Sequence, residues 1–104
     1  MDRLFKNSIT IISVAILITS CTKTPEACFT VDKGKTAKVN EEIQYDASCS
    51  KDADSYSWDF GDGTTGNGSP AKHKYPNTGN YTIVLTAHHS SKSATISQTV
   101  TITQ

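Results

Sequence analysis

The sequence predicts an all-β domain, a sandwich of about seven strands, and three observations carry this prediction. Apolar and polar residues alternate with period two in several segments, as they do in half-buried strands. Turn-forming stretches rich in Gly, Asn, Asp and Ser separate these segments at short intervals. No window has the 3.6-residue periodicity of an amphipathic helix. A chain of 104 residues has room for one such domain.

The first twenty residues are predicted to be a targeting segment rather than part of this domain. Arg3 and Lys6 form a short basic region ahead of an apolar run over residues 9–18. The run is shorter than the roughly 20 residues that a membrane-spanning helix needs, and its length suits a secretory signal. A buried core helix is the alternative, which the β-branched residues of the run disfavour. We therefore expect a signal peptide over residues 1–20.

The end of this segment, Leu17-Ile18-Thr19-Ser20-Cys21, resembles the lipobox of bacterial lipoproteins. The resemblance implies that the Cys21 thiol carries a diacylglycerol, that the chain is cut before Cys21, and that the new amino group is acylated, typically with palmitate. Several acyl chains on one residue give durable anchoring in a membrane. Ordinary cleavage with a free Cys21 is the alternative. Thr22, not Asp, follows Cys21, which is similar to the pattern sorted to the outer membrane, so the expected location is the bacterial cell envelope, with the membrane face left open.

Residues 21–26 are interpreted as the lipidated cysteine with a short polar tether, and residues 27–104 as the domain. Each strand of the domain is expected to bury one parity of its residues. The expected inner positions are Phe29 and Val31, then Ile43, Tyr45 and Ala47, then Tyr56, Trp58 and Phe60, then Tyr81, Ile83, Leu85 and Ala87, and last Ile96, Val100 and Ile102. Gln98 interrupts the last of these faces. Either Gln98 lies at the rim of the sheet or a bulge shifts the register there, and we expect the bulge.

Three segments of the domain resemble the signature of PKD (polycystic kidney disease) domains. Residues 56–63 are YSWDFGDG, residues 69–75 are SPAKHKY, and residues 79–87 are GNYTIVLTA. Their order and spacing are similar to the family pattern of Trp-Asp-Phe-Gly-Asp-Gly, a Pro followed by His-x-Tyr, and Gly-x-Tyr-x-Val-x-Leu. The resemblance covers residues 27–103 and implies an immunoglobulin-like sandwich. Its motif residues here are Trp58, Asp59, Phe60, Gly61, Asp62, Gly63, His73, Tyr75, Gly79 and Tyr81.

The chemistry of the motif residues predicts structural roles for them. Trp58 is large and apolar and is expected to anchor the contact between the sheets, with Phe60 beside it. Asp62 lies between two glycines that permit a positive φ, and its carboxylate is expected to accept backbone N–H bonds in a tight turn. Tyr81 occupies the place of a tyrosine corner, whose hydroxyl bonds back to the backbone, and His73 is assigned to the fold signature.

Two cysteines, Cys28 and Cys49, remain once Cys21 is assigned to lipid. An exported chain with two further cysteines normally pairs them. Cys28 opens the first strand and Cys49 follows the second, so an antiparallel arrangement would bring both to one end of the sandwich. We expect a disulfide between them, and two buried free thiols are the alternative.

Charge and motifs argue against several classes of function. The formal net charge is zero and no basic stripe is interleaved with aromatic residues, so nucleic acid is not an expected partner. We expect no enzyme and no cofactor, since no nucleophile stands in a motif with its base. Asp52 and Asp54 are candidate Ca²⁺ ligands, but ordinary turn carboxylates are the preferred interpretation. His88 and His89 are adjacent in a strand and point to opposite faces, so they are not expected to share a metal ion.

The PKD resemblance implies a binding or spacer module that works outside the cytoplasm. We expect a non-enzymatic binding lipoprotein, anchored to the membrane by lipid, whose partner is an envelope or extracellular protein. Lys72 and Lys74, with the polar loop of residues 64–69, are the candidate contacts. One alternative is a carbohydrate-binding module, for which Tyr75 is the one loose aromatic candidate. The other is a passive structural spacer of the envelope.

Overall fold

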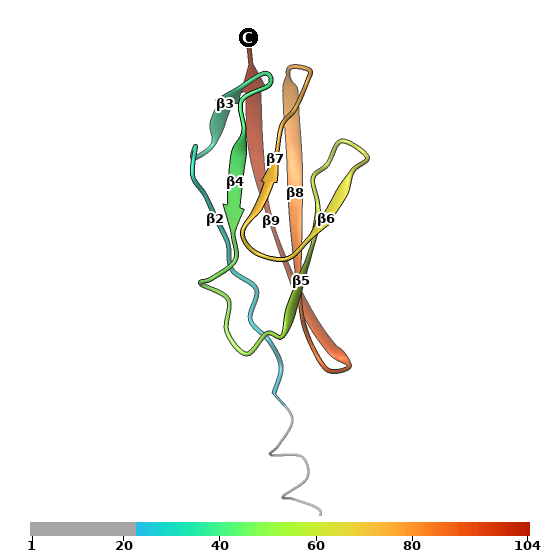
Figure 1. The fold of residues 1–104 in the computed structure, drawn as a ribbon. Coiled ribbons are helices and arrows are strands. Elements are labelled where there is room, and N and C mark those ends of the chain that lie inside the picture. Colours follow the sequence, from blue (N-terminus) through green and yellow to red (C-terminus); the bar gives the residue numbers. More distant parts are fainter. Residues whose placement is uncertain (1–22) are drawn as a thin grey trace, which may run out of the picture.

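The computed structural model describes residues 23–104 (Figure 1), so the predicted signal peptide and Cys21 lie outside the described residues. The regular structure of these residues is entirely β, and no helix among them is long and apolar enough to cross a membrane. Eight strands form two sheets, a three-stranded sheet in the order β2-β4-β7 and a five-stranded sheet in the order β3-β9-β8-β5-β6. The predicted all-β sandwich is confirmed, with one strand more than expected.

The strand bounds follow the alternation of apolar and polar residues. The three-stranded sheet is antiparallel and contains β2 (Thr30–Val31), β4 (Ile43–Asp46) and β7 (Ala71–His73). The five-stranded sheet contains β3 (Thr36–Lys38), β5 (Ser55–Asp59), β6 (Thr65–Asn67), β8 (Gly79–His89) and β9 (Lys92–Thr103). β3 runs parallel to β9, and the other pairs of this sheet are antiparallel. The early strand β3 therefore lies beside β9, the last strand of the domain.

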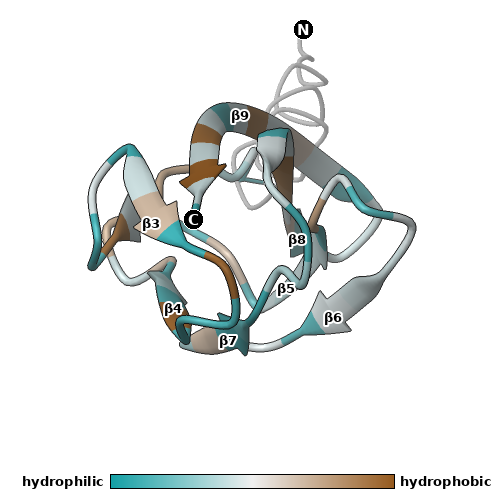
Figure 2. Cartoon of the chain, turned by 90° about the horizontal axis from the view of Figure 1, so that it is seen from above, coloured by the Kyte–Doolittle hydropathy of each residue, from teal (hydrophilic) through white to brown (hydrophobic). Residues whose placement is uncertain are grey.

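The core lies between the sheets and is built from aromatic rings. Phe29, Tyr45, Trp58 and Phe60 are each at most 4% exposed, and their ring centroids lie 5.1 to 6.4 Å apart. Such contacts combine a large buried apolar area with favourable ring geometry. Figure 2 looks along the sandwich, with β4 and β7 on one side of this core and β9 on the other. The predicted role of Trp58 and Phe60 as anchors between the sheets is confirmed.

Two predictions about the last strand are wrong. β8 and β9 keep one unbroken register from the Gly79–Ile102 pair to the His89–Lys92 pair, so there is no bulge at Gln98. The Gln98 side chain instead donates a hydrogen bond from Nε2 to the Phe29 carbonyl oxygen at 2.8 Å, which gives its half-buried amide a partner. Ile96, expected in the core, is 38% exposed although its partner Leu85 in β8 is fully buried, because β3 pairs with β9 only at residues 101–103 and leaves Ile96 on an open edge of the sheet.

The predicted disulfide joins Cys28 to Cys49, with their Cα atoms 5.3 Å apart. Hydrogen bonds reinforce the same junction. Glu26 and Lys51 exchange both backbone N–H bonds, at 2.9 and 3.0 Å. The Ser50 hydroxyl accepts from the Cys28 N–H and donates to the Cys28 carbonyl oxygen. The start of the domain is thus fastened to the loop that follows β4.

Candidate functional site

The turn after β5 is held by the Asp62 carboxylate, as predicted. Asp62 Oδ1 accepts from the Thr64 N–H at 3.1 Å, and Asp62 Oδ2 lies 2.7 Å from His73 Nε2. The His73 ring stacks on Phe60, with centroids 4.3 Å apart. Burial raises the pKa of Asp62, but hydrogen bonds from Thr64 and His73 outweigh that effect and hold this pKa below its usual value. These side chains are occupied in shaping the fold.

Gly61 and Gly63 of the motif both have positive φ, but different constraints exclude a side chain at the two positions. Gly61 has a φ of 82° and Gly63 a φ of 92°, both in the region that side chains other than glycine rarely adopt. A Cβ atom on Gly61 would collide with the Thr82 carbonyl oxygen, whereas nothing lies within 4 Å of a Cβ atom on Gly63. The Gly61 N–H also donates to Asp59 Oδ1 at 3.0 Å. Gly61 is therefore required by the close approach of the turn to β8, and Gly63 by its backbone conformation alone.

The motif tyrosines bond to the backbone. Tyr81 forms the predicted tyrosine corner, because its hydroxyl donates to the Asn77 carbonyl oxygen at 2.9 Å. Tyr75 is fully buried; its hydroxyl donates to the Phe60 carbonyl oxygen at 2.7 Å and lies 3.3 Å from the Tyr45 hydroxyl. Burial raises the pKa of both Tyr75 and Tyr45. The suggestion that Tyr75 is a free aromatic ring for stacking on a sugar is wrong, because its hydroxyl finds partners inside the core.

The candidate calcium ligands Asp52 and Asp54 lie near one end of the sandwich, as do His88 and His89. Asp52 Oδ1 is 3.5 Å from Lys23 Nζ, and Asp54 Oδ2 is 3.2 Å from His89 Nδ1, although these last two atoms lack hydrogen-bond geometry. His88 is engaged elsewhere, with Nε2 3.0 Å from the Ser57 hydroxyl. Within residues 23–104 no three His, Cys, Asp or Glu side chains come close enough together to hold a metal ion. Asp52 and Asp54 do not converge with other ligands.

The candidate protein contacts occupy two neighbouring edge strands. Lys72 and Lys74 lie on and just after β7, the edge of the three-stranded sheet, and both are exposed. The polar loop predicted over residues 64–69 contains β6, the edge of the five-stranded sheet. Thr64 Oγ1 approaches His73 Nε2 at 3.4 Å, so the two edges lie side by side. We call Lys72, Lys74 and residues 64–69 the lysine side of the sandwich.

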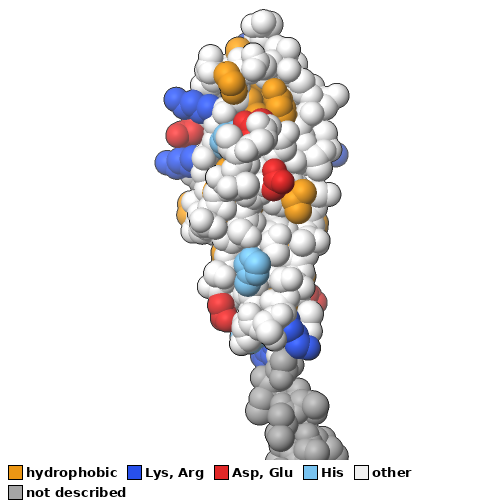
Figure 3. All heavy atoms as spheres, turned by 90° about the vertical axis from the view of Figure 1, so that its right-hand side faces the viewer, with side chains coloured by type: hydrophobic (Ala, Val, Ile, Leu, Met, Phe, Trp, Pro, Cys, Tyr) orange, Lys and Arg blue, Asp and Glu red, His pale blue; other side chains and the backbone are white. Residues whose placement is uncertain are grey.

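The outer face of the five-stranded sheet carries almost no charge. The strand register assigns it eighteen outward residues, fourteen of them Ser, Thr or Asn. These fourteen are Thr36, Ser55, Ser57, Thr65, Asn67, Asn80, Thr82, Thr86, Ser93, Thr95, Ser97, Thr99, Thr101 and Thr103; the other four are Lys38, Asp59, Val84 and His88. Figure 3 views the molecule from the side of β6, and most of that surface is neither charged nor hydrophobic. We call this outer face the hydroxyl face.

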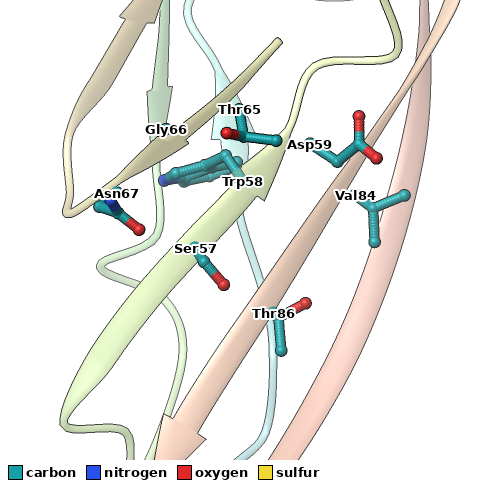
Figure 4. Close-up of a pocket in the computed structure, with 8 residues that line it drawn as sticks. All are labelled: Ser57, Trp58, Asp59, Thr65, Gly66, Asn67, Val84 and Thr86. Carbon is teal, nitrogen blue, oxygen red and sulfur yellow. The ribbon is translucent and has the colours of Figure 1, made fainter. Parts of the chain in front are cut away.

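A shallow hollow lies on the hydroxyl face over β5, β6 and β8 (Figure 4). Its volume is about 400 Å³, and its lining includes Ser57, Asp59, Asn67 and Thr86. A second hollow of about 550 Å³ shares Ser57 and Asn67 with the first and continues past Tyr56 to Asp54. Local sequence patterns did not predict either hollow, because each is lined by residues from strands that are separate in the sequence.

Two aromatic residues border these hollows in different ways. Trp58 is 2% exposed, and its indole Nε1 donates to the Gly68 carbonyl oxygen at 2.7 Å, so the ring lies beneath the first hollow. Tyr56 was expected in the core, and it packs against the core while remaining half-buried. Its pairing with the buried Ala87 places its ring on the core side of the sheet, and the residue borders the second hollow.

The two-layer sandwich, the motif turn and the tyrosine corner together define an immunoglobulin-like β-sandwich. A family model described as the PKD domain matches residues 22–104. The chain therefore belongs to the PKD domain family.

Known proteins share this domain as one part of longer chains. Collagenase ColA of Clostridium perfringens is 44% identical over 68 residues, which make up 62% of this chain and 6% of the collagenase. The PKD1 domain of the Vibrio cholerae metalloprotease PrtV is 25% identical with a TM-score of 0.65, over 79% of this chain and all of that one. A structure described as the basis for the promiscuous specificity of carbohydrate-binding modules from the β-sandwich superfamily is 29% identical with a TM-score of 0.73, over 79% of this chain and 35% of that one.

Proposed function

We propose that this chain is a lipid-anchored, non-catalytic binding protein of the cell envelope, whose PKD domain engages a protein partner through the lysine side. The lipobox-like residues 17–21 support attachment of lipid at Cys21. The disulfide between Cys28 and Cys49 is in keeping with an oxidising compartment outside the cytoplasm.

The observation that carries the proposal is the pair of exposed lysines on β7 and just after it. Lys72 and Lys74 have the same strand parity, so both ammonium groups project outward. Neither lysine forms an ion pair with another residue of the 23–104 segment. Between and after them, His73 and Tyr75 are held in the interior by bonds to Asp62 and Phe60. Two unpaired cations on a rigid backbone favour an acidic protein surface and speed its association.

The two side chains that most resemble a catalytic nucleophile and its base are Ser57 and His88, and their surroundings support the non-catalytic part of the proposal. Ser57 Oγ and His88 Nε2 are 3.0 Å apart, which is a suitable distance for a nucleophile and its base. A catalytic histidine also needs a group that orients its other ring nitrogen. Within the described part of the chain, no further side chain hydrogen-bonds to His88. The pair is better explained as a diagonal hydrogen bond between β5 and β8.

Photo-crosslinking in intact cells tests this function. Benzoylphenylalanine replacing Lys72 or Lys74 should yield a discrete adduct with a partner protein, while the same group at Thr99, on the hydroxyl face, should not. A Cys21→Ala variant should lose both palmitate labelling and the adduct. Adducts that form equally from position 99, or no adduct from either lysine position, would refute the lysine side as the contact.

A glycan is the second candidate partner. The hydroxyl face is rich in hydroxyl groups and has few charged residues, and the similarity to the structure described for carbohydrate-binding modules supports the same role. Fold similarity alone does not assign a ligand, so this role needs its own site.

A further inference from the structure

We propose that a neutral polysaccharide chain binds along β5, in the groove formed by the two hollows of the hydroxyl face. This inference rests on the glycan-binding role proposed above as the second candidate. The groove is defined by Asp54, Tyr56, Ser57, Asp59, Asn67 and Thr86.

The shape of the groove suits an extended chain. Ser57 and Asn67 line both hollows, so the two are adjacent. From Asp54 to Asp59 the groove follows five residue steps along β5, which corresponds to about 17 Å at the rise of an extended strand. That length accommodates several sugar residues in a row, whereas a compact ligand would fill only one of the hollows.

The polar groups of the groove match the chemistry of sugars. Hydroxyls and side-chain amides both donate and accept hydrogen bonds, as sugar hydroxyls do. Asn67 and Thr86 project from the same face of the sheet (Figure 4), and neither side chain has a hydrogen-bond partner within residues 23–104. Their hydrogen-bonding capacity is therefore available to a ligand.

The charges in and around the groove select for a neutral chain. Asp59 and Asp54 are its two carboxylates, one toward each end, and no lysine or arginine lines either hollow. Lys72 and Lys74 lie on the other sheet. An anionic polysaccharide would meet like charge without a compensating cation, which costs binding energy. A neutral sugar can instead donate a hydroxyl to Asp59, a charge-assisted hydrogen bond of the stronger kind.

The edge beside the groove is poorly suited to a peptide. β6 has three residues, with glycine at position 66, and the chain continues through Gly68 to Pro70, which has no N–H to donate. Short edges with nearby Pro are features that prevent addition of a further strand. A polypeptide pairing as an extra strand is therefore a less suitable occupant than a sugar chain.

The single tryptophan of the chain provides a direct assay, since Trp58 lies under the groove. Full-length lipidated protein in a zwitterionic detergent would be titrated with cellohexaose, maltohexaose and chitohexaose, and with anionic hexagalacturonate as the charged control. We expect a saturable change in Trp58 fluorescence with at least one neutral hexasaccharide, unchanged by salt, and no change with hexagalacturonate.

Matched variants locate the binding. Asn67→Ala and Thr86→Val each remove one hydrogen-bonding group and should weaken binding about tenfold. Thr82→Val makes the same change on the same face outside the groove, and Lys72→Ala changes the other sheet; both should bind as the wild type does. Hydrogen exchange measured with bound sugar should slow in the peptides that contain β5 and β6.

The outcomes separate the location from the glycan role. Sugar binding that survives both groove variants, with protection elsewhere, would overturn the groove and leave the glycan role intact. The absence of binding to every neutral probe would overturn both. A dimer in sedimentation that excludes sugar from the hydroxyl face would assign that face to a second copy of the chain and overturn the proposal.

Discussion

Removal of the Cys28–Cys49 disulfide should lower the free energy of unfolding by about 3 kcal/mol. The crosslinked residues are 21 positions apart in the sequence. Closing a loop of that length removes about 11 cal/mol/K of entropy from the unfolded chain, or about 3 kcal/mol at 25 °C. For a domain of this size the loss is a large share of the total stability. The effect is expected despite the Glu26–Lys51 hydrogen bonds at the same junction, because those bonds form only in the folded state.

The variant to measure is Cys28→Ser/Cys49→Ser, made with Cys21→Ala in both it and the reference so that no unpaired lipid-site thiol interferes. With an unfolding slope of about 1 to 1.5 kcal/mol/M in urea, the midpoint should fall by about 2 to 3 M. Ser50→Ala is the control, since it removes the Cys28 hydrogen bonds and keeps the crosslink, and it should cost only about 1 kcal/mol. A midpoint shift of less than about 0.5 M in the double-serine variant would refute the loop-entropy reasoning.

Three further predictions concern the motif residues. Gly61→Ala should lower the free energy of unfolding by about 2 to 4 kcal/mol and Gly63→Ala by about 1 to 2 kcal/mol, because a side chain at position 61 adds a collision with Thr82 to the strain of positive φ. Equal losses of stability in thermal melts of the two variants would refute the close-approach argument. Asp62→Asn should cost about 1 to 2 kcal/mol at pH 7. The pKa of Asp62 is lowered in the folded state, so the stabilisation it provides is present above the usual carboxyl pKa and is lost as pH falls through the lowered pKa. The urea midpoints of the variant and the wild type should therefore converge below about pH 4. Tyr75→Phe should cost about 1 to 3 kcal/mol, since it leaves the buried Phe60 carbonyl without its donor, and Tyr81→Phe, which removes a more exposed bond, should cost less.

The sequence predicted most of the buried face of each strand, because strand periodicity is local. Tyr45, Trp58, Ile83 and Leu85 are buried as their parity requires. The same parity failed at Ile96, since this part of β9 is an open edge of the sheet, which depends on where β3 pairs. The parallel pairing of β3 with β9 joins distant segments and has no local signature.

The candidate site was predicted less completely than the fold. The lysines and the edge around β6 were identified as surface. The tyrosine corner followed from the family motif, and the disulfide followed from the two cysteines that remained once Cys21 was assigned to lipid. The groove was not predicted, since it is lined by residues of β5, β6 and β8 that are distant in the sequence. Tyr75 was misplaced because a sequence does not reveal whether a tyrosine hydroxyl will find a buried acceptor.

The fastening of the domain's first residues to the loop after β4 has a mechanical consequence. In a chain held at its N-terminal end, tension enters the sandwich at Cys28 and passes through the covalent bond to Cys49. The pairing of β2 with β4, which comprises only Thr30–Asp46 and Val31–Tyr45, would otherwise have to resist that load. The crosslink lets the force bypass this weak ladder and reach β4 directly. A pull on the N-terminal end would therefore not first peel off β2, the shortest strand.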